Sequence, residues 1–284
     1  MESPPTGSWS ESAREYDSFE KKWHFYATVA GELVRSLQLR PSSRVLELAS
    51  GTGVCTSILA GLCPNGRVTG LDLSEEMVEV ARQNVGVAGF SNVRFVCGDA
   101  QKLAATFGGE SFDVAVCNSA FWHFPDGEAV LKGLRELLTG PGQFGMSLPS
   151  WRVGSPSKWV SYRGKIRELL LKHGADPESV ERRFGESEAR RKDISALLRN
   201  SGFTLVKDRA FQFEFPAEAR EQWRSIPVFA SLPTRRGQLF SNLDPSAAAK
   251  AQEELLEWRK QNLPNEQGVS RWRILVASME ASSE

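Results

Sequence analysis

Apolar runs alternate with helix-like stretches along the first half of the chain. Five such runs predict strands, and the segments between them show the three-to-four-residue apolar spacing of helices. Because consecutive parallel strands need a crossover helix, this alternation predicts an α/β fold with a parallel sheet covered by helices on both faces. The predicted strands are 44–49, 67–73, 93–97, 112–118 and 142–147, and the predicted helices between them are 55–62, 74–87 and 128–138.

The pattern is different on either side of this alternation. Residues 1–12 are rich in Ser, Pro and Gly and predict a loose tail, whereas 12–39 has helical periodicity. After Pro149 the rhythm stops, and the later segments predict a helix at 193–200, a strand at 203–208 that can extend through Phe215, a helix at 245–261 and a last strand at 271–279. The chain therefore divides into a tail and helical lid (1–40), a core (41–149), an insertion (150–192) and the end of the sheet (193–284) with a second insertion (216–268).

Composition and charge exclude several classes of protein. The chain has 284 residues, 40% of them hydrophobic and 25% charged, which is ordinary globular usage. Thirty-five Lys and Arg balance thirty-five Asp and Glu, so bulk attraction to nucleic acid or an anionic membrane is not expected. No stretch approaches the roughly 18 apolar residues of a membrane span, and the start lacks the order of a signal peptide. We expect a soluble cytoplasmic protein.

The cysteines and histidines do not suggest a metal site. The four cysteines are scattered without a C-x-x-C pair, and the three histidines are isolated in sequence. We expect no metal, and reduced, mostly buried thiols at Cys55, Cys63, Cys97 and Cys117.

The first predicted strand contains Glu47 and runs into a turn with two glycines, Ala49-Ser50-Gly51-Thr52-Gly53, before a helix begins. Glycines at such a turn let the backbone approach a ligand closely, and the start of the helix offers free N–H groups. The alternative is a tight connection that binds nothing. The turn therefore indicates a small-molecule cofactor without identifying it.

The next three predicted strands also end in polar or glycine residues. Asp72 ends the second strand, where a carboxylate suits hydrogen bonding to ribose hydroxyls, and Ser74 fits better than Asp72 as the N-cap of the following helix. The third strand ends at Gly98-Asp99-Ala100 and the fourth at Asn118. Open α/β sheets bind ligands at the carboxyl edge of their strands, so four such ends together predict a cofactor site there.

The glycine spacing argues against a nicotinamide cofactor, because Thr56 stands where the dinucleotide fingerprint needs its third glycine. Read from Ala49, the turn has the pattern Ala-x-Gly-x-Gly. With this pattern the sequence resembles the class I S-adenosylmethionine-dependent methyltransferases, and among them the ubiquinone/menaquinone-biosynthesis-type small-molecule enzymes. The resemblance implies a Rossmann-like, doubly wound seven-stranded sheet with an antiparallel final strand and mainly helical cap insertions. The segments that carry it are 45–53, 70–77, 98–100 and 112–118.

The same resemblance implies a role for individual residues, with S-adenosylmethionine as the cofactor. Residue Ala49 stands where the family commonly has its first glycine, a change of one small residue for another. The implied cofactor contacts are Glu47 and the turn Ala49, Gly51 and Gly53 at the methionine end, Asp72 at both ribose hydroxyls, Leu73 and Met77 beside the adenine, Asp99 and Ala100 at its polar edge, Asn118 at the amino-acid portion, and Tyr16 on the lid helix.

The segment Phe121-Trp122-His123 follows the fourth strand and faces the expected methyl group. His123 is the candidate general base, since imidazole titrates near neutral pH; a histidine that only hydrogen-bonds backbone is the alternative. Phe121 and Trp122 could shape an aromatic acceptor site or belong to the core. Tyr16 likewise either contacts the cofactor or only packs.

The segment 151–192 has eleven Lys and Arg against six Asp and Glu. A solvated, ion-paired helix and a lid that recognises an anionic acceptor or RNA are both consistent with it. We expect a methyltransferase that acts by in-line displacement on a small, apolar or aromatic molecule. The alternatives are a protein that binds S-adenosylmethionine without catalysis, and a methyltransferase acting on RNA or protein.

Overall fold

A single seven-stranded sheet organises the computed structural model, which describes residues 6–150, 158–181, 184, 194–230, 240, 243–262 and 268–279. The strand order is β3-β2-β1-β4-β5-β7-β6, and each predicted strand is present. β5 begins earlier than predicted, because the register between β4 and β5 shifts and takes up the Gly140–Gly142 segment. The strands are β1 (Arg44–Leu48), β2 (Arg67–Asp72), β3 (Val93–Cys97), β4 (Phe112–Cys117), β5 (Leu138–Pro149), β6 (Phe203–Glu214) and β7 (Val269–Met279).

The direction of the strands confirms the predicted doubly wound sheet. β1 is parallel to β2 on one side and to β4 on the other, so the chain order reverses at β1. β7 is antiparallel to both β5 and β6, as the family resemblance implied for the last strand. The carboxyl ends of β1 to β4 consequently share one edge of the sheet, at the point where open α/β sheets bind ligands.

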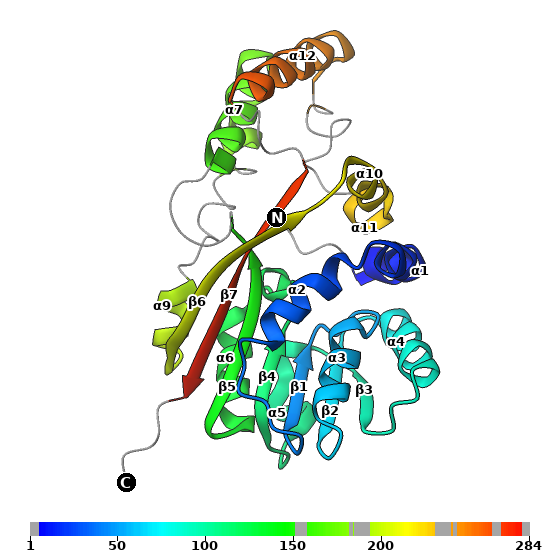
Figure 1. Cartoon of the computed structure of the whole chain (residues 1–284). Helices are drawn as coiled ribbons and strands as arrows, with labels where there is room; N and C mark the ends of the chain where they lie inside the picture. Colours follow the sequence, from blue (N-terminus) through cyan, green and yellow to red (C-terminus); the bar gives the residue numbers. More distant parts are fainter. Residues whose placement is uncertain are drawn as a thin grey trace.

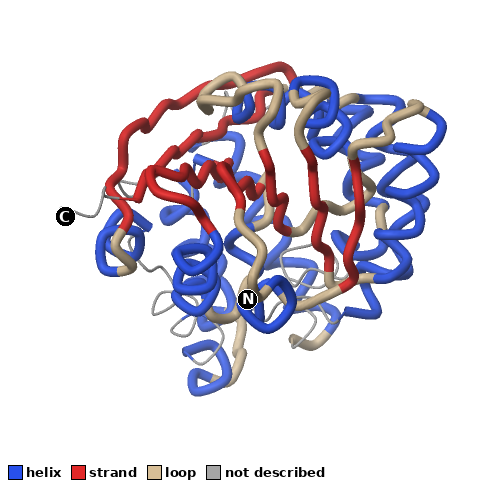
Figure 2. Tube along the Cα trace, turned by 90° about the horizontal axis from the view of Figure 1, so that it is seen from below, coloured by secondary structure: helices blue, strands red, loops and turns tan. Residues whose placement is uncertain are grey.

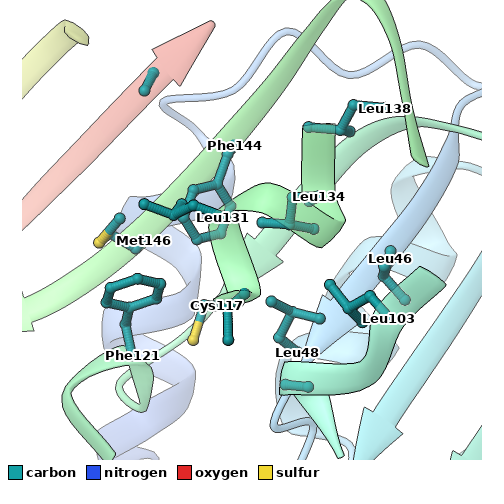
Figure 3. Close-up of a cluster of buried hydrophobic side chains, with 14 of the residues drawn as sticks. Leu46, Leu48, Leu103, Cys117, Phe121, Leu131, Leu134, Leu138, Phe144 and Met146 are labelled. Carbon is teal, nitrogen blue, oxygen red and sulfur yellow. The ribbon is translucent and has the colours of Figure 1, made fainter. Parts of the chain in front are cut away.

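Alternate side chains of the buried strands supply two cores, one on each face of the sheet. Helices lie on both faces of the sheet (Figure 2). Leu46 and Leu48 face one side, in a core that includes side chains of α5 (Leu103–Phe107) and α6 (Gly127–Leu137), and that continues to α9 (Ile194–Asn200) beside β6 (Figure 3). Val45 faces the other side, under α2 (Phe25–Val34) and α3 (Val54–Leu62). Because β1 is buried on both faces, only its ends can carry a ligand site.

The N-terminal segment differs from the prediction of a loose tail over residues 1–12. A helix, α1 (Thr6–Trp23), begins inside that segment, and a sharp break at His24 (φ 51°) separates it from α2. Glu20 is buried at the break and accepts the backbone N–H groups of Tyr26 (2.8 Å) and Ala27 (2.7 Å). This carboxylate satisfies the free donors at the start of α2, so the two helices meet at a fixed corner.

The two insertions do not form separate caps. Helix α7 (Lys158–Lys172), from the first insertion, packs on α12 (Pro245–Asn262), from the second, around a core of their own that includes Ile166, Leu169 and Leu255 (Figure 1). Helices α10 (Ala217–Ser225) and α11 (Pro227–Ala230) instead pack on α1. Much of the basic segment, at 151–157, 182–183 and 185–193, lies outside the described residues. Within the described part of the chain, no helix has the length and apolarity to cross a membrane.

Candidate functional site

A cavity of about 340 Å³ opens at the carboxyl ends of β1 to β4, between the sheet and α1. Its size is in the range of small-molecule sites. Ten of the sequence-predicted site residues line it: Tyr16, Ala49, Gly51, Asp72, Leu73, Met77, Asp99, Ala100, Asn118 and His123. The remaining lining residues are Trp9, Leu71, Ser74, Gly98, Gln101, Ser119, Ala120, Phe124 and Pro125.

Asp72 ties the glycine turn to the end of the second strand. Its two carboxylate oxygens accept the backbone N–H groups of Gly51 (2.8 Å) and Ser74 (3.0 Å). Burial raises the pKa of Asp72, while these hydrogen bonds act in the opposite direction. Ser74 is the N-cap of α4 (Glu75–Val87) and accepts the Met77 N–H (3.2 Å), as predicted. The carboxylate is therefore fixed at the cavity wall before any ligand binds.

The turn itself has a backbone suited to close approach. Ala49 and Gly51 both have positive φ, 52° and 53°, and a Cβ added at Gly51 would meet no atom within 4 Å. Among the described residues, the hydroxyls of Ser50 and Thr52 are buried without a hydrogen-bond partner. Buried polar atoms without partners are uncommon in native structures, but neither hydroxyl lines the cavity, where Ala49 and Gly51 represent the turn.

Two of the predicted cofactor residues, Glu47 and Gly53, lie behind this turn and do not line the cavity. Gly53 has φ 84° at the start of α3, and a Cβ there would come within 3.1 Å of the Ala81 side chain. Glu47 is buried in β1, where its carboxylate accepts the Thr56 hydroxyl. Burial raises the pKa of Glu47 to about 8. These residues shape the turn from within the protein.

Asp99 and Ala100 lie at the end of β3, where a short 3-10 helix (Ala100–Lys102) begins. The Asp99 carboxylate accepts the backbone N–H of Gln101 (2.9 Å) and also its side-chain amide (3.2 Å). The side-chain amide oxygen of Gln101 in turn accepts the N–H of Asp126 (2.9 Å), the N-cap of α6. Gln101, which sequence reasoning missed, therefore links the end of β3 to the start of α6.

A network of hydroxyl and amide groups fixes the end of β4. The Asn118 amide oxygen accepts the hydroxyl of Ser147 (2.8 Å), and its nitrogen donates to the carbonyl of Tyr26 (3.3 Å). Ser147 also accepts the N–H of Ser119 (2.8 Å), which has φ 60°. With the Asn118 side chain occupied in this way, its backbone and Ser119 are left at the cavity surface. A non-glycine residue in a left-handed conformation is a strained backbone, and such strain clusters at functional sites.

The far wall of the cavity consists of aromatic side chains from α1. The Tyr16 ring stacks on Tyr26 (centroids 5.1 Å apart), and among the described residues its hydroxyl has no hydrogen-bond partner. The Trp9 ring meets the His123 ring edge to face at 5.5 Å. His123 ends a second 3-10 helix (Phe121–His123), so the segment after β4 and helix α1 build this wall together. Trp9 was not among the predicted site residues, because the composition of residues 1–12 predicted a loose tail there.

The neighbours of His123 belong to the protein interior. Phe121 is buried in the core beside Met146, and Trp122 packs against Trp272 (Figure 3). Neither lines the cavity, which favours the core interpretation of both. Phe124 lies at the cavity surface in their place, a contact that no motif in the sequence predicts.

The residues of the cavity fit a cationic nucleoside. Among the described lining residues, Asp72 and Asp99 are the charged side chains, and neither Lys nor Arg is present. Leu73, which is 54% exposed, and the buried Met77 provide apolar surface beside them. A site with two carboxylates, apolar side chains and a glycine turn matches a sulfonium-bearing nucleoside in charge and shape. Within the described residues, no group of His, Cys, Asp and Glu is placed to hold a metal ion.

This fold is a Rossmann-like α/β sheet with a small-molecule-sized cavity at the ends of its parallel strands, and comparison with known proteins identifies the family. Residues 39–226, more than half of the chain, match a family model described as a methyltransferase domain. The chain belongs to this family and is an S-adenosylmethionine-dependent methyltransferase.

Named relatives agree with this assignment. A demethylmenaquinone methyltransferase of Geobacillus stearothermophilus is 33% identical over 189 residues, covering 64% of this chain and 80% of the relative. A malonyl-[acyl-carrier protein] O-methyltransferase of Paenibacillus sp. (strain JDR-2) is 28% identical over 206 residues, covering 70% and 71%. A provisionally assigned methyltransferase from Bacillus halodurans C-125 has the same fold, with a TM-score of 0.59, 19% identity and coverage of 89% and 100%.

Proposed function

We propose that this methyltransferase acts on a small, apolar or aromatic molecule and binds its cofactor through the predicted residues that line the cavity. The observation that carries the proposal is the division of the cavity into two walls. The strand ends bring carboxylates and a glycine turn, while α1 and the segment after β4 bring Trp9, His123 and Phe124. A cofactor on the first wall would present its reactive end to a mostly apolar space. The name of the Geobacillus relative, demethylmenaquinone methyltransferase, agrees with an acceptor of this kind.

The proposed roles follow the positions of the side chains. Asp72 would accept hydrogen bonds from the ribose, and Leu73 and Met77 would pack beside the adenine, whose polar edge would meet Asp99 and Ala100. Asn118 and the turn Ala49–Gly53 would hold the amino-acid end, with Tyr16 closing over it. Glu47 and Gly53 would contribute by fixing the turn, because they lie behind it.

When bound, S-adenosylmethionine supplies an electrophilic methyl group, which a lone pair of the acceptor takes in line while the electron pair of the breaking carbon–sulfur bond stays on sulfur. Holding the two reactants in line provides much of the rate enhancement. His123 would receive the proton that an oxygen, nitrogen or sulfur acceptor loses, since it lines the cavity beside Trp9. Helix α1, whose Trp9 and Tyr16 line the cavity, would exclude solvent from this space.

The cofactor assignment is tested by calorimetry with S-adenosylmethionine. Asp72→Ala removes the charged acceptor, so we expect about 10- to 100-fold weaker binding. Asp244→Ala is the matched control, since Asp244 also accepts two backbone N–H groups, of Ser246 and Ala247, but on α12. Undiminished binding by the Asp72 variant would refute the site.

The catalytic assignment is tested by following conversion of labelled cofactor in an acceptor screen. His123→Ala and His123→Gln should both lower turnover while affinity for the cofactor stays within severalfold. Equal turnover would show that no base acts from this position. Binding without turnover on any acceptor would favour the non-catalytic alternative, and transfer to RNA or protein alone would overturn the small-molecule acceptor.

A further inference from the structure

Trp9 occupies a central place in the far wall of the cavity. Its ring makes three edge-to-face contacts: with His123 at 5.5 Å, Phe229 at 5.8 Å and Tyr16 at 6.3 Å. It lines the cavity, whereas Phe229 lies behind it in the cluster of aromatic side chains between α1, α11 and β7. Trp9 therefore presents an indole surface next to His123, in the cavity that Asp72 and Asp99 also line.

The start of α1 is attached to its surroundings at several points, and this fixes the position of Trp9. The Ser10 hydroxyl lies 3.1 Å from that of Ser74, the N-cap of α4. The buried Ser12 hydroxyl accepts the N–H of Val228 (2.8 Å) on α11. One turn farther, Asp17 accepts the side-chain amide of Asn84 (2.8 Å), on α4. An aromatic ring held in place before binding loses little conformational entropy when a ligand packs on it.

The charge of the cavity restricts what can pack against Trp9. Among the described lining residues there is no Lys or Arg, and the two charged side chains, Asp72 and Asp99, are both carboxylates. An acceptor that carries a carboxylate or phosphate would lose its hydration without gaining an ion pair or hydrogen bond from a Lys or Arg side chain among these residues, which is costly. A neutral ring meets no such penalty and gains aromatic contact with the indole.

We propose that Trp9 selects the methyl acceptor, and that it selects a neutral planar ring over an anion. The inference deepens the proposed function and rests on it, because it needs the cofactor to occupy the carboxylate wall. It also separates this chain from the relative whose name specifies a malonyl group, since malonyl carries a free carboxylate. The residue acts as a determinant of specificity through direct contact with the acceptor.

The test measures binding of three probes to the protein saturated with S-adenosylhomocysteine: 2-naphthol, its saturated analogue decahydro-2-naphthol, and 2-naphthoate. We expect 2-naphthol to bind most tightly and 2-naphthoate at least about tenfold more weakly. Trp9→Leu should weaken 2-naphthol about fivefold and abolish its advantage over the saturated analogue. Trp9→Phe should restore most of that advantage, and Trp258→Leu, on α12, should change none of the affinities.

Each contrary result has a distinct meaning. If 2-naphthoate binds as tightly as 2-naphthol, if 2-naphthol does not bind, or if Trp9→Leu leaves the preference intact, the proposal for Trp9 is overturned. If the unsubstituted protein does not bind S-adenosylhomocysteine, the proposed cofactor site fails first. Binding of S-adenosylhomocysteine within about twofold in all variants, with unchanged thermal melting, confirms that the fold and the cofactor wall are intact.

Discussion

The two walls of the cavity are built in different ways. On the strand side, backbone turns are held by hydrogen bonds within and between adjacent strand ends, such as those from Ser74 and Gly51 to Asp72. On the helix side, α1 is held by aromatic packing and by hydrogen bonds between residues far apart in sequence, such as Val228 to Ser12. The strand wall thus forms together with the adjacent parallel strands whose ends it joins, whereas the helix wall also needs segments from opposite ends of the chain to come together.

A buried carboxyl group that does not line the cavity supports each wall from behind. Glu47 supports the strand wall, where burial raises its pKa to about 8, and Glu20 supports the corner of α1 and α2, where burial raises its pKa to about 7. The partners differ, because Glu47 accepts a hydroxyl and Glu20 accepts two backbone N–H groups. The difference suggests that Glu20 positions a helix, and that Glu47 stabilises a strained turn.

The largest expected loss of stability follows a substitution in the strand wall, at Gly53. Gly53→Val introduces a branched side chain where φ is 84° and where a Cβ already lies 3.1 Å from Ala81. Left-handed strain and overpacking together should lower the free energy of unfolding by about 3 kcal/mol, measured in urea. Gly51→Ala is the matched control: it has the positive φ but open space, and should lose only about 1 kcal/mol. Equal losses would show that packing behind the turn is unimportant.

The next effect concerns the pH dependence of stability. A carboxyl group whose pKa is raised in the folded state keeps its proton where the unfolded chain has lost it, so stability falls as pH rises. Stability should fall from about pH 4.5 to about pH 7 because of Glu20, and from about pH 4.5 to about pH 8 because of Glu47. Glu47→Gln, which keeps an acceptor for Thr56, should reduce that fall by about 1 to 2 kcal/mol between pH 5.5 and 7.5.

Urea unfolding of both proteins at several pH values checks this prediction. The free energy of unfolding of Glu47→Gln should rise relative to that of the parent as pH rises. Parallel curves would mean that Glu47 is ionised in both the folded and the unfolded protein over this pH range. Glu20→Gln provides the comparison between walls. Its amide cannot accept both N–H groups, so it should be less stable than the parent already at pH 5.5, where Glu47→Gln should have little effect.

The same contrast explains what the sequence could predict. The seven strands and the residues at their ends, such as Asp72 and Asn118, follow from local patterns, because a buried parallel strand and the turn after it are contiguous in sequence. Trp9 belongs to a segment with no helical pattern of its own, and it is placed by contacts with α4 and α11. The pairing of α7 with α12 joins segments from two insertions, which periodicity cannot relate.

A smaller effect is expected for the tyrosines of the helix wall. The Tyr26 hydroxyl accepts the indole N–H of Trp223 (3.0 Å), whereas among the described residues the Tyr16 hydroxyl has no such partner. Tyr26→Phe should therefore lower the free energy of unfolding by about 1 kcal/mol, and Tyr16→Phe should leave it nearly unchanged. Calorimetry should give the opposite order for S-adenosylmethionine, with only Tyr16→Phe weakening binding. The same response from both variants would place Tyr16 outside the cofactor site.

The smallest effect is a gain in stability at Ala49. This residue has φ 52°, a conformation that costs an alanine about 1 kcal/mol and a glycine nothing in steric terms. Part of the gain is offset by the greater freedom of glycine in the unfolded chain, so Ala49→Gly should stabilise the protein by about 0.5 kcal/mol. Affinity for S-adenosylmethionine should stay within about twofold, since the turn is already held by Asp72. A marked loss of affinity would mean that the Ala49 methyl group itself contacts the cofactor, and that the strand wall depends on side chains as much as the helix wall does.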